Sequence, residues 1–147
     1  MRFTLDSNIL VYAVDVGAGD RHAMAAEILM RAMTSNAILT TQAIGEFLAV
    51  ARRKNPSTFA SAASEAARWA TVFPVAPTTS DHLIAAAAMA ERFKLQFWDC
   101  VIWQAALTGG ASIFVSEDLQ DGLSIEGMTV LDPFPASNAH RLAGLFG

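Results

Sequence analysis

The chain has 147 residues, of which 53% are hydrophobic and 16% are charged, and its formal net charge is −4. This length suits one domain with a single core. The acidic balance disfavours a protein that coats nucleic acid, because such binding depends on Lys and Arg neutralising phosphates. Apolar runs are short, or are interrupted by Pro74 and Pro77, so no membrane span is predicted.

The first part of the chain predicts short strands that alternate with helices. A buried strand is expected at 2–5, followed by a helix at 8–14 that Asp6 or Ser7 caps. After a turn at 17–20, Asp20 can cap a helix that runs to about Met33. A second strand is expected at 36–41, and a helix at 42–54 that ends before Pro56. The apolar stripe of that helix is Ile44, Phe47, Leu48 and Ala51.

The second part continues the same alternation. An Ala-rich helix starts at Ser57 and ends before "FPVAP", and Ser80 or Asp81 caps the next one, "HLIAAAAMAERF". A third helix spans 99–108, and strands are expected at 112–116 and 128–131. This order predicts an α/β fold with a mostly parallel central sheet covered by helices on both faces. We expect a single domain over residues 1–147, with a core at about 2–134 and a tail at 135–147.

Four carboxylates fall where such a sheet places its ligands. Asp6 ends the first strand, Glu46 lies one turn into the helix after the second strand, Asp99 starts a helix, and Asp118 follows the strand "SIFVS". Ligands of open parallel sheets bind beyond the carboxyl ends of the strands, so these four side chains can share one edge. Glu117 is expected to point away, because neighbours at a strand end alternate faces.

Each carboxylate also has a purely structural interpretation. Asp6 and Asp99 can cap the helices that follow them, Glu46 can face solvent opposite its apolar stripe, and Asp118 can belong to a surface turn. Taken together, however, clustered carboxylates repel one another, and a hard divalent cation relieves that repulsion. Mg²⁺ or Mn²⁺ held there can promote hydrolysis of a phosphodiester. The chain has no P-loop, dinucleotide-binding or GxSxG motif, and His22, His82 and His140 lie far apart.

Four segments of the chain resemble the PIN-domain ribonuclease family, and VapC-like toxins of bacterial type II toxin–antitoxin systems in particular. These are "FTLDSNILVYA", "TTQAIGEFLAV", "FWDCVIWQAAL" and "IFVSEDLQDG", which occur in the family's order, and "IEGMTVLDPF" resembles the closing segment. One departure is Asp132 before Pro133 and Phe134, where many relatives have Asn; this puts only a turn contact in doubt. The resemblance covers about residues 2–134.

The resemblance implies a three-layer PIN-like fold and a metal-dependent endoribonuclease that uses Mg²⁺ or Mn²⁺. It makes Asp6, Glu46, Asp99 and Asp118 the catalytic, metal-binding cluster, with Asp6 and Asp99 as the most direct ligands. Possible supporting residues are Ser7, Asn8, Ser116 and Asp121, of which Asp121 can equally be a turn residue. It also implies an RNA substrate, a cognate antitoxin and a homodimer.

The sequence leaves several residues, and the function itself, with more than one interpretation. Arg21, Arg52, Arg53 and Lys54 are candidates for RNA contacts, although 52–54 can equally be a solvated helix end. Trp98, Trp103 and Phe47 belong either to the core or to a partner surface. Cys100 is the only cysteine, which fits a reducing cytoplasm. The alternative functions are a catalytically inactive PIN-like partner-binding module, or a haloacid-dehalogenase-like phosphatase, whose second Asp is replaced here by Asn8.

Overall fold

The computed structural model describes all residues 1–147 and contains one six-stranded sheet. The strands are β1 (Phe3–Leu5), β2 (Ala37–Thr40), β3 (Val75–Ala76), β4 (Ile113–Val115), β5 (Ser124–Ile125) and β6 (Met128–Leu131). Their order in the sheet is β3-β2-β1-β4-β6-β5. Every pairing is parallel except that of β5 with β6. The predicted α/β class with a mostly parallel sheet is therefore confirmed.

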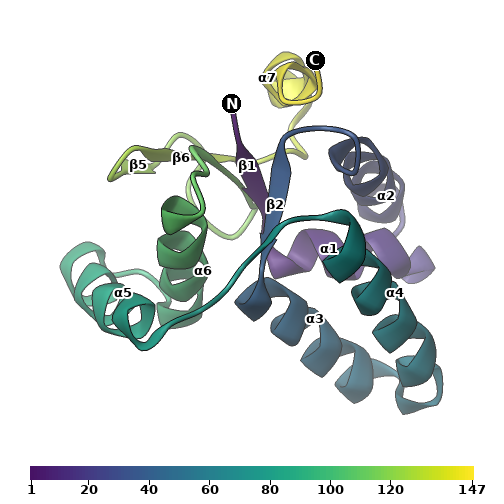
Figure 1. The fold of residues 1–147 in the computed structure, drawn as a ribbon. Helices are drawn as coiled ribbons and strands as arrows, with labels where there is room; N and C mark the ends of the chain where they lie inside the picture. Colours follow the sequence, from purple (N-terminus) through teal and green to yellow (C-terminus); the bar gives the residue numbers. More distant parts are fainter.

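Seven α-helices surround the sheet. They are α1 (Ser7–Val14), α2 (Asp20–Ala32), α3 (Thr41–Lys54), α4 (Phe59–Val72), α5 (Ser80–Phe93), α6 (Phe97–Thr108) and α7 (Ala139–Gly144). In Figure 1, α5 and α6 lie on one side of β1 and β2, whereas α1, α2 and α4 lie on the other. No helix has the length and apolar composition that crossing a membrane requires.

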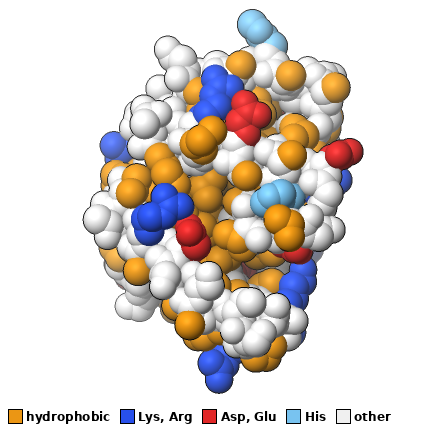
Figure 2. All heavy atoms as spheres, turned by 90° about the vertical axis from the view of Figure 1, so that its right-hand side faces the viewer, with side chains coloured by type: hydrophobic (Ala, Val, Ile, Leu, Met, Phe, Trp, Pro, Cys, Tyr) orange, Lys and Arg blue, Asp and Glu red, His pale blue; other side chains and the backbone are white.

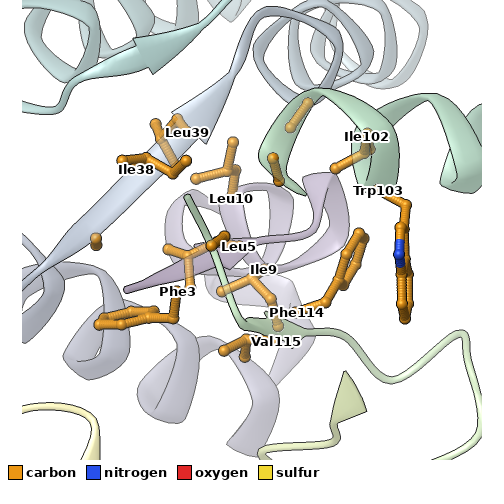
Figure 3. Packing of buried hydrophobic residues seen from close by; sticks show 14 of the residues in the cluster. Phe3, Leu5, Ile9, Leu10, Ile38, Leu39, Ile102, Trp103, Phe114 and Val115 are labelled. Atoms are coloured by element: carbon orange, nitrogen blue, oxygen red, sulfur yellow. The ribbon is translucent and has the colours of Figure 1, made fainter. Parts of the chain in front are cut away.

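The core is built on the central strands. Every residue of β1 and β2 is buried, as expected for strands of a parallel sheet that helices cover on both faces. Figure 3 shows Phe3 and Leu5 of β1 among the side chains of Ile9, Ile38 and other buried residues. Trp103 stacks on Phe114 with 5.6 Å between ring centroids. This packing holds β1 rigidly at the centre of the sheet.

The helix caps differ in part from those predicted. Thr79 caps α5, rather than Ser80 or Asp81, because its side chain accepts from the backbone N–H of His82 at 3.3 Å. The sixth helix starts at Phe97, and Gln96 caps it by accepting from the N–H of Asp99 at 3.0 Å. The N-cap of α2 is Gly19, with φ 64°, so Asp20 instead lies in the first turn.

Both edges of the sheet are short strands that the sequence did not reveal. Strand β3 has two residues between Pro74 and Pro77, and β5 has two residues before a tight turn to β6. Proline lacks the N–H that a neighbouring strand needs, which confines it to such edges. The edges are therefore irregular, while the site lies near the central strands.

An open groove of about 530 Å³ runs between α1, α3 and α4. Seven of its thirteen lining residues are hydrophobic, among them Val14, Val16 and Phe47, and Lys54 lies beside Asp15 at its rim. Figure 2 shows apolar side chains gathered in a hollow on this side of the molecule. None of the four candidate carboxylates, Asp6, Glu46, Asp99 and Asp118, lines the groove, so it is not part of the candidate site.

Candidate metal centre

Asp6 connects the end of β1 to the start of α1. Its backbone N–H donates to the carbonyl of Val115 at 3.0 Å, which continues the pairing of β1 with β4. One carboxylate oxygen accepts from the N–H of Ser7 at 2.7 Å, and the other accepts from the hydroxyl of Ser116 at 2.7 Å. The residue is only 1% exposed. Asp6 does cap α1, as the structural interpretation held, but a cap alone needs no such burial.

The other three carboxylates come from separate elements. Glu46 is half-buried on α3, and its Oε1 atom is buried with no hydrogen-bond partner. Asp99 is half-buried in the first turn of α6, and since Gln96 is the cap, the capping interpretation of Asp99 is wrong. Asp118 is exposed on the loop after β4 and accepts from the side-chain amide of Asn8. A buried unpaired carboxylate oxygen is rare, because it loses its hydration without gaining a bond.

The pKa values of these acids indicate that they influence one another. Burial raises the pKa of Asp6 to about 7; the Ser116 bond opposes the rise, and the charges of Asp99 and Asp118 add to it. Burial, and then the charges of Asp118 and Glu46, raise the pKa of Asp99 to about 6. Burial raises the pKa of Glu46; the nearby side chains of Ser7 and Gln42 oppose the rise, and the charge of Asp118 adds to it. The four predicted acids thus share one electrostatic environment.

This set of donors fits a hard divalent cation held partly through water. No three Asp, Glu, His or Cys side chains are arranged to enclose a metal ion by themselves. Mg²⁺ seldom requires such a cage, because it keeps several waters and is often bound by one or two carboxylates. A nearby cation would give the unpaired Oε1 of Glu46 a partner. It would also lower the raised pKa values of Asp6 and Asp99.

The predicted supporting residues fall into two groups. Ser116 and Ser7 both donate to Asp6, and Ser116 also accepts from the backbone N–H of Asp118 at 3.1 Å. Asn8 donates to Asp118. In contrast, Asp121 pairs with Arg141 at 3.1 Å and accepts from the N–H of Asp132 at 3.0 Å. Its contacts are therefore those of a turn residue.

The predicted basic residues are mostly occupied by other contacts. Arg21 forms an ion pair with Glu117 at 2.7 Å, and this turns Glu117 away from the four acids. Lys54 lies 3.9 Å from Asp15, and the guanidinium of Arg52 lies 5.1 Å from the ring centroid of Phe59. Arg53 is exposed and forms no ion pair. The sequence does not reveal these pairings, because the partners of Arg21 and Lys54 lie far along the chain.

The aromatic candidates divide between core and surface. Trp103 and Phe47 are buried, so the core interpretation holds for both. Trp98 is 43% exposed at the start of α6, directly before Asp99. Tyr12 was not singled out from the sequence, although its hydroxyl donates to Glu117 next to Asp118. Only the closeness of α1 to the loop after β4 reveals that contact.

Comparisons with known proteins identify related folds. The model of the PIN domain family matches residues 3–120. No curated protein matches the chain. Among solved structures, the chain is similar to VapC20 of Mycobacterium tuberculosis, described as a toxin that cleaves the sarcin–ricin loop, with 20% identity and a TM-score of 0.64 over 76% of this chain and 86% of that one.

Two further solved structures are similar over most of their length. A toxin–antitoxin complex from Klebsiella pneumoniae has 19% identity and a TM-score of 0.63, covering 89% of this chain and 97% of that chain. VapBC2 from Rickettsia felis, bound to a DNA fragment from its promoter, has 13% identity and a TM-score of 0.62, covering 88% and 97%. At these identities the likeness shows a shared fold.

Proposed function

The chain belongs to the PIN domain family, as its motifs predicted, and from this premise we propose that it is a metal-dependent endoribonuclease. It acts as the toxin of a toxin–antitoxin pair and hydrolyses phosphodiester bonds of RNA in the cytoplasm. Nucleases of this family generally use divalent metal ions. The observation that carries the proposal is the cluster of four carboxylates around the buried Asp6, two of which have pKa values raised to about 7 and about 6.

We assign the roles from the contacts of each side chain. Asp6 and Asp99 would hold Mg²⁺ or Mn²⁺ most directly, because both are partly or fully buried and their charges are uncompensated. The unpaired Oε1 of Glu46 would orient the attacking water or receive its proton. Asp118 would complete the cluster, held by Asn8. Ser7 and Ser116 would fix the orientation of Asp6.

The ion would supply electrostatic stabilisation of the phosphate and activation of water, as divalent ions do in other nucleases. The protein supplies position: β1 at the centre of the sheet fixes Asp6 more narrowly than a loop would. The carboxylates repel RNA phosphates, so binding would need positive charge nearby. Arg53 is the candidate for this contact, because it forms no ion pair within the protein.

The partners proposed are an antitoxin protein and a second copy of the chain. Similar structures are described as toxin–antitoxin complexes, which supports a cognate antitoxin. An inactive partner-binding module would retain the fold without binding metal. A haloacid-dehalogenase-like phosphatase is disfavoured because Asn8, where that chemistry has its second Asp, donates a hydrogen bond to Asp118.

The test uses purified protein and a pool of cellular RNA, with Mg²⁺, with Mn²⁺ or with EDTA. Asp6→Asn is the inactivating variant, and Glu27→Gln, at an exposed ion pair with Arg31, is the matched control. We expect discrete fragments that require metal, persist in Glu27→Gln and vanish in Asp6→Asn. Intact RNA together with no Mn²⁺ binding by calorimetry would favour the inactive module. Phosphate release from small phosphoesters would favour the phosphatase.

A further inference from the structure

The loop after β4 directs three successive side chains to three different places. Ser116 points inward and donates to Asp6 at 2.7 Å. Asp118 returns toward the carboxylate cluster and accepts from Asn8. Between them Glu117 turns away from the cluster toward α1 and α2, and its side chain is only 15% exposed. Glutamate side chains are mostly exposed to solvent. The burial of Glu117, directly before a candidate metal ligand, therefore indicates a structural role.

Both carboxylate oxygens of Glu117 are occupied. The hydroxyl of Tyr12, on α1, donates to Oε1. Arg21, on α2, donates to Oε2 from Nε at 3.0 Å and from Nη2 at 2.7 Å. Charge-assisted bonds of this kind are shorter and stronger than neutral ones, and two nitrogens of one planar guanidinium also fix direction. Glu117 is thus tied to two helices that precede it by about a hundred residues.

The two donors are themselves held in place by Phe134. The rings of Tyr12 and Phe134 meet edge to face with centroids 5.8 Å apart, and the guanidinium of Arg21 lies 4.8 Å from the centroid of the Phe134 ring. His22 adds a contact of 2.9 Å from its Nδ1 to the carbonyl of Tyr12. Because these contacts with Phe134 and His22 do not involve Glu117, they restrict Tyr12 and Arg21 independently of it, and the bond to Glu117 needs little further ordering of the donors.

We propose that Tyr12, Arg21 and Glu117 are positioning residues, which anchor the loop after β4 and thereby set Asp118 against the other three carboxylates. Asp118 is exposed; its side chain accepts only from Asn8, and its backbone N–H donates to Ser116, so the anchor at Glu117 adds a further restraint on where its backbone lies. The inference rests on the proposed function for its catalytic meaning. It also reassigns Arg21, which was predicted as an RNA contact, to a contact within the protein.

The two roles of Arg21 make opposite kinetic predictions. An arginine that binds an RNA phosphate raises KM when it is lost and leaves kcat nearly unchanged. An arginine that positions Asp118 through Glu117 lowers kcat and weakens metal binding, with KM little changed. The Glu117→Gln variant distinguishes the two roles a second time. It would free Arg21 to bind RNA, and on our proposal it would still lower kcat.

The experiment compares Glu117→Gln, Tyr12→Phe and Arg21→Gln with the wild type. Arg141→Gln is the matched control, because it breaks the ion pair to Asp121 of the same loop, a residue that does not influence the pKa values of Asp6, Glu46 or Asp99. Four quantities are measured: Mn²⁺ affinity by calorimetry, kcat and KM on a cleaved RNA, and the rate of hydrogen exchange of the amides at 116–119. We expect Mn²⁺ affinity and kcat to fall about 10- to 100-fold, as for other residues that orient metal ligands. We expect KM to change less than about threefold and the amides to exchange faster, with Arg141→Gln like the wild type.

Three outcomes decide the inference. Unchanged Mn²⁺ affinity, kcat and exchange in Glu117→Gln and Tyr12→Phe would overturn it. A raised KM with unchanged kcat in Arg21→Gln would overturn the assignment of Arg21 and restore the RNA contact. If the wild type neither binds Mn²⁺ nor cleaves RNA, the proposed function fails, and faster exchange at 116–119 in Glu117→Gln alone would still support the anchor. Tyr12→Phe, which removes one hydroxyl, serves if Glu117→Gln does not fold.

Discussion

Replacing Asp6 by asparagine is expected to stabilise the metal-free protein at neutral and higher pH. Asp6 is 1% exposed, and its pKa is raised from 3.8 to about 7, first by burial and then by Asp99 and Asp118. Each pKa unit between the folded and unfolded states is worth about 1.4 kcal/mol, so the ionised side chain destabilises the folded state by up to about 4 kcal/mol. Asparagine is similar in size, carries no charge and keeps one acceptor oxygen.

The pH dependence follows from the direction of this rise. Below pH 3.8 the carboxyl is protonated in both states and has no effect on stability. As the pH rises toward 7, the unfolded chain releases this proton and the folded chain retains it, so stability falls; above about 7 the loss is constant. Between about pH 5 and pH 8 the free energy of unfolding of the wild type should therefore fall by roughly 2–3 kcal/mol. That of Asp6→Asn should not show this fall.

The assay is urea unfolding of both proteins in EDTA at these two pH values. The difference between the proteins is the informative quantity, because the other acids titrate in both. An equal pH dependence in wild type and variant, or a less stable variant at pH 8, would refute the reasoning. Adding Mg²⁺ should raise the midpoint of the wild type and leave Asp6→Asn nearly unchanged, because ligands stabilise the state they bind.

Three further predictions concern single positions. Asp99→Asn should lower metal-dependent cleavage at least about a hundredfold and weaken Mn²⁺ binding, and an unchanged calorimetric affinity would remove Asp99 from the ligand set. Phe47→Ala, at a site 1% exposed, should destabilise the protein by about 3–5 kcal/mol in urea unfolding. Met30→Ala, at a site 64% exposed, should change stability by less than about 0.5 kcal/mol, and similar effects of the two would contradict the assigned core. Thr79→Ala should cost about 1 kcal/mol and Thr79→Ser much less, because serine retains the capping hydroxyl.

The sequence predicted the elements with strong periodicity and missed those too short to have any. Residues 128–131 were predicted as a strand and form β6. Strand β3 has only two residues, and no alternation can be read from two positions. At the start of α5 three consecutive residues could cap, and only the structure selects Thr79. The start at Phe97 was missed because glutamine, which caps α6, is not a favoured cap residue.

The four candidate carboxylates could be singled out from the sequence, but their surroundings could not. Glu46 lies opposite the apolar stripe of its own helix, which predicts exposure, yet one of its oxygens is buried. The spacing of apolar residues shows which face of a helix packs against one neighbouring layer. It does not show whether another segment of the chain covers the opposite face. The same limit hides the contact of Glu117 with Arg21, which joins residues 96 positions apart.

The two short edge strands have a consequence for how copies of this protein can associate. An exposed edge with free N–H and C=O groups invites another strand and leads to aggregation. Here one edge is a two-residue strand between two prolines, and the other is two residues long beside a tight turn. Neither provides the continuous row of donors that an added strand requires. Extension of the sheet from copy to copy is therefore disfavoured, and contacts between copies are expected on the helices and loops instead.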